Sequence, residues 1–238
     1  MSNLATGRRV RVALLVPSSN TVMENDLHAA LPKDRFTVHT DRMYLVETTR
    51  DAETSMIEEH ARPAAKDVGT TDPDVLVFGC TSAGSLIGLD YDVRVCAELG
   101  QLARCPAIGV INAVSDALSR AQAQRIAVIT PYNEDLTRAV AAAVNTPGRE
   151  IVAAHGMGIT VNVELADPTP ADIVHFATER LKGLTFDTLF VSSTNYRALE
   201  AKAELEAVFG TRVVTSNSAV VEAIHARFPS PTAGTAAQ

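Results

Sequence analysis

The sequence contains no tryptophan, and aromatic residues make up only 5% of its 238 residues. Hydrophobic residues nevertheless account for 46% of the chain, which is enough for a sizeable core. Because large rings are scarce, that core must consist mainly of alanine, valine and leucine. Small side chains of this kind suit closely packed layers of helix on sheet.

The chain also lacks an excess of basic charge. Its net charge is −7, with acidic and basic residues mixed along the sequence. A nucleic acid or an anionic membrane surface selects a basic face, so neither is an expected partner. No apolar run reaches the roughly 18 residues of a membrane helix, and residues 1–9 contain no apolar signal region. We therefore expect a soluble, cytoplasmic protein.

The sequence also lacks the cysteine pattern of a disulfide framework and the glycine motifs that bind nucleotides. The three cysteines, Cys80, Cys96 and Cys105, are odd in number and show no CxxC spacing, which favours reduced thiols over a disulfide framework. The pair Gly156 and Gly158 lacks the rest of a dinucleotide fingerprint, and no P-loop is present. The sequence thus offers no sign of a nucleotide cofactor.

What the chain does contain is an alternation of strands and helices. Apolar runs that end in turn residues predict strands buried on both faces, as in parallel sheets. The expected strands are 9–16, 36–40, 75–78, 106–111, 125–130, 150–154, 188–191 and 212–215. Helices are expected over 21–31, 52–67 with a kink at Pro63, 84–102 with a break near Gly88, 112–122, 134–144, 169–181 and 219–228, and one more follows Asn195.

The second half of this pattern repeats the first. Pro17 and Pro131 are 114 positions apart, and so are Cys80 and Thr194. We therefore predict an α/β fold of two pseudosymmetric doubly wound lobes, each with a mainly parallel sheet flanked by helices. The predicted division is a first lobe over 1–120, a second over 121–228 and a flexible tail over 229–238. The active site is expected in the cleft between the lobes.

Cys80 is the leading candidate for chemistry. It follows the apolar run 75–78 and Gly79, and Thr81 and Ser82 come directly after it. Ligands of open α/β sheets bind beyond the carboxyl ends of the strands, where this thiol is expected to lie. A helix N-terminus and backbone N–H groups there would favour its thiolate. A buried structural cysteine is the alternative interpretation, because free cysteine packs like a small apolar residue.

Three segments carry a resemblance to a known family. Val16-Pro-Ser-Ser-Asn-Thr-Val-Met-Glu24, Cys80 and Ile129-Thr-Pro-Tyr-Asn133 resemble the signature of maleate cis-trans isomerases. Those enzymes and the related arylmalonate decarboxylases belong to the aspartate/glutamate racemase superfamily. The similarity runs from about residue 10 to about residue 224.

The resemblance implies roles for individual residues. Cys80 matches the nucleophilic or proton-transferring cysteine, and Thr194 occupies the place where most of the superfamily has a second cysteine. Further residues match or adjoin the carboxylate and oxyanion pockets, and we expect them to bind substrate: Pro17, Asn20, Thr81, Ser82, Tyr132 and Asn195.

Thr194 decides between mechanisms, because a threonine hydroxyl is too weak an acid to replace a thiol. Two-base racemisation needs both thiols, and the decarboxylase protonates its product with the second-lobe cysteine. Isomerisation by covalent addition needs only one nucleophile. We therefore expect a cofactor-independent isomerase of a small dicarboxylic acid, without a metal, which acts as a homodimer or homotetramer. Three alternatives stay open: a one-base racemase or epimerase, a lyase or decarboxylase of another small acid, and a non-catalytic small-acid binder.

Overall fold

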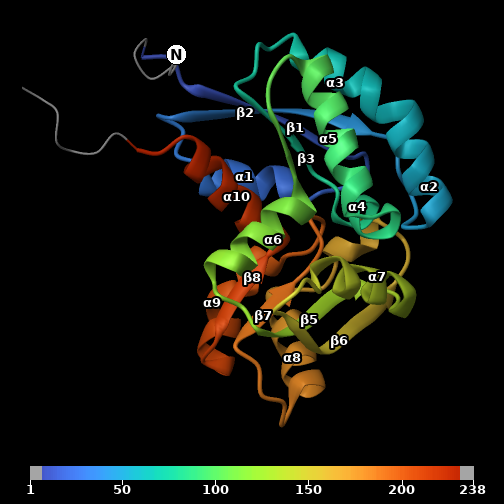
Figure 1. Cartoon of the computed structure of the whole chain (residues 1–238), viewed down its shortest axis with the longest axis vertical. Helices are drawn as coiled ribbons and strands as arrows, with labels where there is room; N and C mark the ends of the chain where they lie inside the picture. Colours follow the sequence, from blue (N-terminus) through green and yellow to red (C-terminus); the bar gives the residue numbers. More distant parts are fainter. Residues whose placement is uncertain (1–6, 231–238) are drawn as a thin grey trace, which may run out of the picture.

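The computed structural model describes residues 7–230, which form two four-stranded parallel sheets covered by helices (Figure 1). The strand order is β2-β1-β3-β4 in the first sheet and β6-β5-β7-β8 in the second. Every strand pair within the two sheets is parallel. The predicted fold class is therefore confirmed. The predicted tail lies, from residue 231 on, outside the described residues.

The strands of the two sheets occupy corresponding places, and the central strands also agree in length. The strands are β1 (Val10–Pro17), β2 (Phe36–Met43), β3 (Val75–Phe78), β4 (Ala107–Gly109), β5 (Arg125–Tyr132), β6 (Glu150–Ile159), β7 (Thr188–Val191) and β8 (Arg212–Thr215). β1 and β5 have eight residues each, and β3 and β7 have four. Cys80 follows β3 as Thr194 follows β7, so the repeat of 114 positions reflects the two-lobed architecture.

Helices connect these strands in chain order. In the first half they are α1 (Met23–Ala30), α2 (Arg50–Ser55), the π-helical segment η2 (Met56–Ala61), α3 (Arg62–Gly69), α4 (Thr81–Ile87), α5 (Leu89–Ala103) and α6 (Val110–Arg120). In the second half they are α7 (Glu134–Val144), the 3-10 turn η3 (Val163–Ala166), α8 (Pro170–Leu181), α9 (Ala198–Phe209) and α10 (Ser216–Arg227). None of the helices within residues 7–230 is long and apolar enough to cross a membrane.

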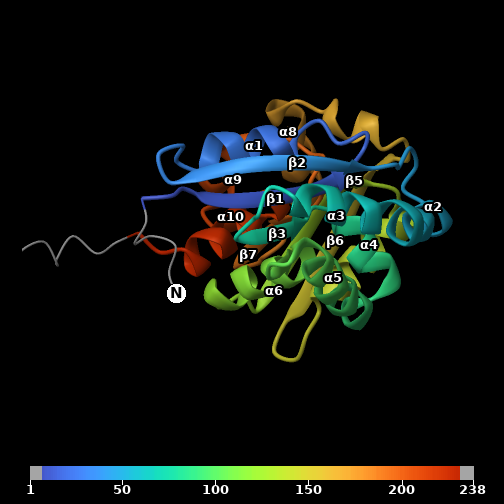
Figure 2. The ribbon, with the colours of Figure 1, turned by 90° about the horizontal axis from the view of Figure 1, so that it is seen from above.

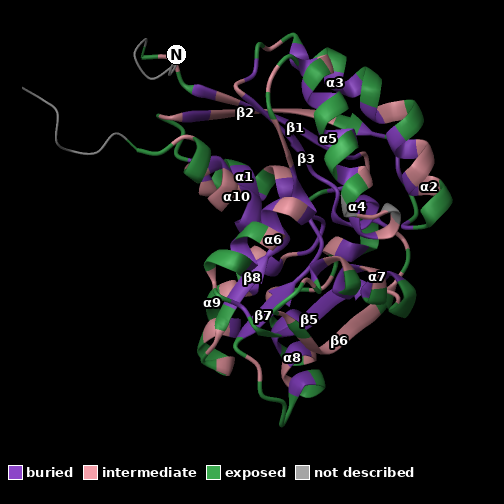
Figure 3. Cartoon of the chain, viewed as in Figure 1, coloured by how far each residue is buried: buried purple, intermediate pink, exposed green. Residues whose placement is uncertain are grey.

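Alternate residues along each strand pack into different apolar cores. In β1, Ala13 and Leu15 face the core under η2, α3 and α5, whereas Val12 and Leu14 face the opposite side. That opposite core continues through α1, α6 and α10 to the inner face of the second sheet. A third core lies under α8 and α9. Figure 3 shows the central strands β1, β3, β5 and β7 as mostly buried, whereas the edge strand β6 is mostly intermediate.

The middle core joins the two halves of the chain. α10, from the second half, packs against α6 and α1 of the first (Figures 1 and 2). An isolated antiparallel bridge between Glu47 and Val161 adds a backbone connection. Because apolar side chains of both halves share one core, the ends of the two sheets are held in a fixed relation. The division of the chain at residue 120 stays a prediction.

Several elements differ from their expected bounds. β2 continues to Met43, α4 begins at Thr81 and α10 begins at Ser216. The strand expected to end at Ala154 continues through Ile159, because glycine lets it approach β5: a Cβ on Gly156 would lie 2.2 Å from the carbonyl oxygen of Tyr132. The helix expected over 52–67 consists of three consecutive segments, α2, η2 and α3, and Pro63 is the second residue of α3, just after the π-helical segment η2. β4 ends at Gly109, so α6 begins two residues earlier than expected.

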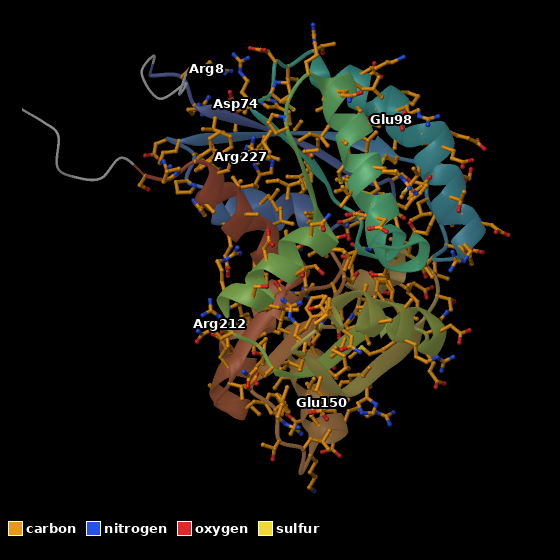
Figure 4. The ribbon with its side chains drawn as sticks, viewed as in Figure 1. Arg8, Asp74, Glu98, Glu150, Arg212 and Arg227 are labelled. Carbon is orange, nitrogen blue, oxygen red and sulfur yellow. The ribbon has the colours of Figure 1, made fainter. Side chains whose placement is uncertain are left out.

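Ion pairs connect neighbouring strands at their N-terminal ends. Arg8 pairs with Asp74 at 2.7 Å, before β1 and β3, and Arg125 pairs with Glu150 at the start of β5 and β6. Figure 4 shows Arg8, Asp74 and Glu150 at the outer edge of the molecule. The carboxyl ends of the central strands point the other way, toward the junction of the lobes.

Candidate active site

Cys80 lies at the carboxyl end of β3 and immediately precedes α4. Glycine is required before it, because a Cβ on Gly79 would lie 2.8 Å from both the carbonyl oxygen of Leu15 and the sulfur of Met23. The Gly79 N–H donates to that same carbonyl at 2.7 Å. The backbone at Gly79 therefore packs directly against β1 where the chain leaves the sheet. This contact fixes the position of the Cys80 thiol.

A buried carboxylate contacts the thiol. Cys80 Sγ donates to Glu53 Oε2 at 3.3 Å and lies 3.3 Å from Ser82 Oγ. Ser82 Oγ in turn donates a short hydrogen bond to Glu53 Oε1. Glu53 comes from α2 and is fully buried. The three side chains therefore form a triangle in which the thiol and the hydroxyl both donate to the carboxylate, and the sulfur also contacts the Ser82 oxygen.

Burial is the main influence on the pKa values of Glu53 and Cys80. It raises the pKa of Glu53 to about 7, against smaller opposing effects of the hydrogen bonds from Ser82 and Cys80. Burial, followed by the charge of Glu53, also raises the pKa of Cys80 well above its ordinary value. A hydrogen bond from the Ala83 backbone N–H lowers the thiol pKa, but by less. The N–H at the start of α4 thus acts on the thiol in the predicted direction, but burial and Glu53 outweigh it in the resting site.

Hydroxyl groups link this triangle to the second lobe. Thr81 Oγ1 donates to Ser216 Oγ at 3.2 Å, and Ser216 Oγ accepts from the Ser193 N–H at 3.1 Å. Burial keeps the pKa of Tyr132 far above the usual range and outweighs the hydroxyls of Ser193 and Ser82, which lower that pKa. Strand ends of both sheets thus meet at one point.

Ser193 also has an unusual backbone. Its φ of +104° lies in a region that residues other than glycine rarely adopt. This conformation occurs between β7 and Thr194, where Ser193 Oγ accepts from the Asn195 N–H at 3.2 Å. Strained backbone of this kind persists where the surroundings hold it, and it is common at functional sites.

Asn20 and Thr194 form a second connection between the lobes. Asn20 Nδ2 donates to Thr194 Oγ1 at 3.1 Å, and Thr194 Oγ1 donates to the carbonyl oxygen of Gly79 at 3.1 Å. Asn20 Oδ1 accepts from the N–H groups of Val22 and Met23. The threonine at the superfamily's second-cysteine position is thus bonded to the residue that precedes Cys80.

Asn195 and Pro17 shape the backbone around this connection. Asn195 Oδ1 accepts from the Thr21 N–H at 2.8 Å, and its Nδ2 donates to the Asn162 carbonyl at 2.6 Å. The carbonyl of Pro17, the last residue of β1, accepts from the Asn20 N–H at 2.9 Å. In this state the Asn195 amide is engaged with protein groups. That these residues bind substrate remains a prediction.

The side chains at this junction are closed off from solvent. Each of the following exposes 4% or less of its surface: Asn20, Glu53, Cys80, Thr81, Ser82, Tyr132, Thr194 and Asn195. The surface hollows of 350 to 650 Å³ at α5–α6, α8, α4–α7 and β6 are lined by other residues. Within residues 7–230, no group of three His, Cys, Asp or Glu side chains could hold a metal ion.

Sequence reasoning missed Glu53, Ser193 and Ser216. Glu53 has a readable signal, because it lies three and four positions before Met56 and Ile57, on the apolar face of a helical stretch. A carboxylate on such a face is rarely buried without a partner. Ser193 and Ser216 follow predicted strands, but serine at a strand end is too common to single out.

Comparison with known proteins agrees with the two-lobed fold. The arylmalonate decarboxylase family model matches residues 12–236. A maleate isomerase from Pseudomonas putida strain KT2440 is 30% identical over 227 residues, which is 90% of each chain. A maleate isomerase from Pseudomonas putida S16, crystallised with maleate, superposes with a TM-score of 0.87, 24% identity and 94% coverage of both chains.

A second solved structure shows the chemistry of a relative. It is a cysteine-to-serine variant of Nocardia farcinica maleate cis-trans isomerase with a covalently bound succinylcysteine intermediate. Its TM-score is 0.84, at 21% identity and 94% coverage of both chains. The family model covers most of the sequence, and a curated relative is 30% identical along nine-tenths of both chains. This chain therefore belongs to the arylmalonate decarboxylase family.

Proposed function

We propose that this protein is a maleate cis-trans isomerase that uses Cys80 as its nucleophile and needs no cofactor. One observation carries the proposal: a single thiol lies at a strand end among hydroxyl and amide groups, with a carboxylate in contact. The family relationship supports the same reaction, since curated relatives are maleate isomerases.

The reaction follows from one nucleophile. The Cys80 thiolate adds to one carbon of the C=C bond, and the displaced electron pair is delocalised into the adjacent carboxylate. The remaining C–C single bond rotates. Return of the electron pair re-forms the double bond in the trans geometry and expels the thiolate. Hydrogen-bond donors aimed at the enediolate stabilise the charge that develops in this step.

The carboxylate-binding groups are proposed from the residues that meet at the junction. Asn20, Thr81, Ser82 and Tyr132 supply amide, hydroxyl and phenol donors, and Pro17 and Asn195 shape the turn around Asn20. Thr194 supplies a hydroxyl where a second acid would be needed for two-base chemistry.

We also propose a cytoplasmic location and a homodimer or homotetramer. The described cysteines are all unpaired, which fits a reducing compartment. Multi-angle light scattering of the purified protein tests the oligomeric state.

Proton NMR of the purified enzyme in D2O, with a panel of small dicarboxylates and amino acids, tests the function. We expect maleate to be converted to fumarate without an added cofactor. Absence of any change in maleate, together with racemisation or decarboxylation of another acid, would contradict the proposal.

A further inference from the structure

The resting thiol is almost completely shielded from solvent and from any base in it. Cys80 exposes 2% of its surface, and burial together with the nearby carboxylate keeps it protonated. A neutral thiol is a poor nucleophile, because the thiolate is the reactive form. The proposed reaction therefore requires a base within reach of the sulfur.

Glu53 is the group in that position. Its Oε2 accepts from Cys80 Sγ, and its Oε1 accepts from Ser82 Oγ, so one oxygen faces the thiol while the other is held by a serine. The titratable groups that face Glu53 in the described part of the chain are Cys80 on α4 and Tyr132 on β5. Burial keeps Tyr132 neutral, which leaves the thiol and the carboxylate to share a proton.

We propose that Glu53 is the general base that takes the proton of Cys80 and returns it to the sulfur when the product leaves. This role rests on the proposed isomerisation. It places the acid–base group in the same lobe as the nucleophile, whereas the second-lobe position holds Thr194, a hydroxyl bonded to the Gly79 carbonyl.

The proton and charge balance as follows. Before the reaction the pair carries one negative charge, on Glu53, and one proton, on sulfur. The proton passes from Cys80 Sγ to Glu53 Oε2 as the sulfur electron pair forms the S–C bond and the π electrons move into the substrate carboxylate. On elimination the S–C electron pair returns to sulfur, and Glu53 gives the proton back. No further reactant is consumed.

A purely structural carboxylate would be a costly choice here. A buried charge without a cation is unfavourable, and Gln or Met would fill the same space. The desolvation that raises the pKa of Glu53 to about 7 matches its basicity to neutral pH, where a general base works best.

The variant Glu53→Gln tests this role, because it keeps the shape of the side chain and removes the basic oxygen. The measurement is the pH dependence of kcat/KM between pH 5 and 10. In the unmodified enzyme the rate should rise with pH through about 7, as Glu53 ionises. In the variant, activity at pH 7 should fall about 10²- to 10⁴-fold, and the rise should move to more alkaline pH, where solvent base removes the thiol proton. Glu58→Gln is the matched control, since it removes an exposed charge from the adjoining segment and should leave the profile unchanged.

Alkylation of Cys80 by iodoacetamide, followed by mass spectrometry, gives a readout that needs no substrate, and its first measurement uses the unmodified protein alone. The unmodified protein should show a rate that rises near pH 7, and Glu53→Gln should lose that rise. If the unmodified protein shows one rise only, at the alkaline pH of an unassisted thiol, the base role is overturned. Equal kcat/KM profiles for Glu53→Gln and the parent would overturn it as well. If maleate is not converted but the alkylation rise at pH 7 depends on Glu53, the base role stands and the proposed substrate is wrong.

Discussion

Cys80→Ser should reduce the isomerisation rate at least about 10⁴-fold, as loss of the nucleophile does in enzymes that use covalent catalysis. A serine hydroxyl is a far weaker acid than a thiol, so Glu53 cannot convert it to a useful nucleophile. The fold should be kept, because the hydroxyl is smaller and can donate to the same Glu53 oxygen. Steady-state kinetics with maleate and a thermal unfolding curve measure the two effects separately.

The other two cysteines provide the controls for this experiment. Cys96 is buried beside Asp92 and Gly109, and Cys105 is half-buried after α5. Neither forms part of the junction that holds Cys80, so Cys96→Ser and Cys105→Ser should keep most of the activity. Comparable activity in all three serine variants would exclude a Cys80 nucleophile.

Gly79→Ala should have the second-largest effect on rate. The new methyl group would lie 2.8 Å from the Leu15 carbonyl oxygen, which is part of β1 and cannot move without breaking the sheet. The strand end must shift instead, carrying Cys80 away from Glu53. A displacement of about 1 Å at a reacting group costs on the order of 10²-fold in rate. Overpacking of this kind also destabilises a core by about 1–3 kcal/mol.

Gly210→Ala separates these two effects. Gly210 ends α9 with φ of +62° and has nothing within 4 Å of its missing Cβ, so alanine strains the backbone without touching the site. Both variants should unfold at lower temperature, but only Gly79→Ala should lose kcat. If the two lost activity in proportion to their stability, the placement of the thiol by Gly79 would be refuted.

The architecture was readable from the chain because parallel strands buried on both faces leave unbroken apolar runs. Val75–Phe78 is such a run, and the turn after it identifies Cys80 as a residue at a strand end. The spacing of 114 positions located its counterpart, Thr194, without any contact information. Glycines misled the prediction at β6, where Gly156 marks close packing against Tyr132 and not the end of a strand.

The electrostatics of the site could not be predicted in the same way. Glu53 is 27 positions from Cys80, and the fold alone brings α2 onto α4. A helix N-terminus beside a cysteine suggests a lowered thiol pKa, but complete burial and a neighbouring carboxylate act in the opposite direction and are stronger. Both are tertiary effects, so neither the base nor the sign of the pKa shift is visible in the local sequence.

Mass spectrometry of enzyme quenched during turnover of maleate in D2O tests the Cys80 adduct most directly. One substrate mass should be added at the peptide that contains Cys80, and the fumarate should carry little deuterium, because the adduct rotates and eliminates before its carbanion takes up a solvent proton. An unmodified Cys80 peptide, together with rapid racemisation of aspartate or glutamate and full deuterium incorporation at Cα, would contradict the single-thiol mechanism.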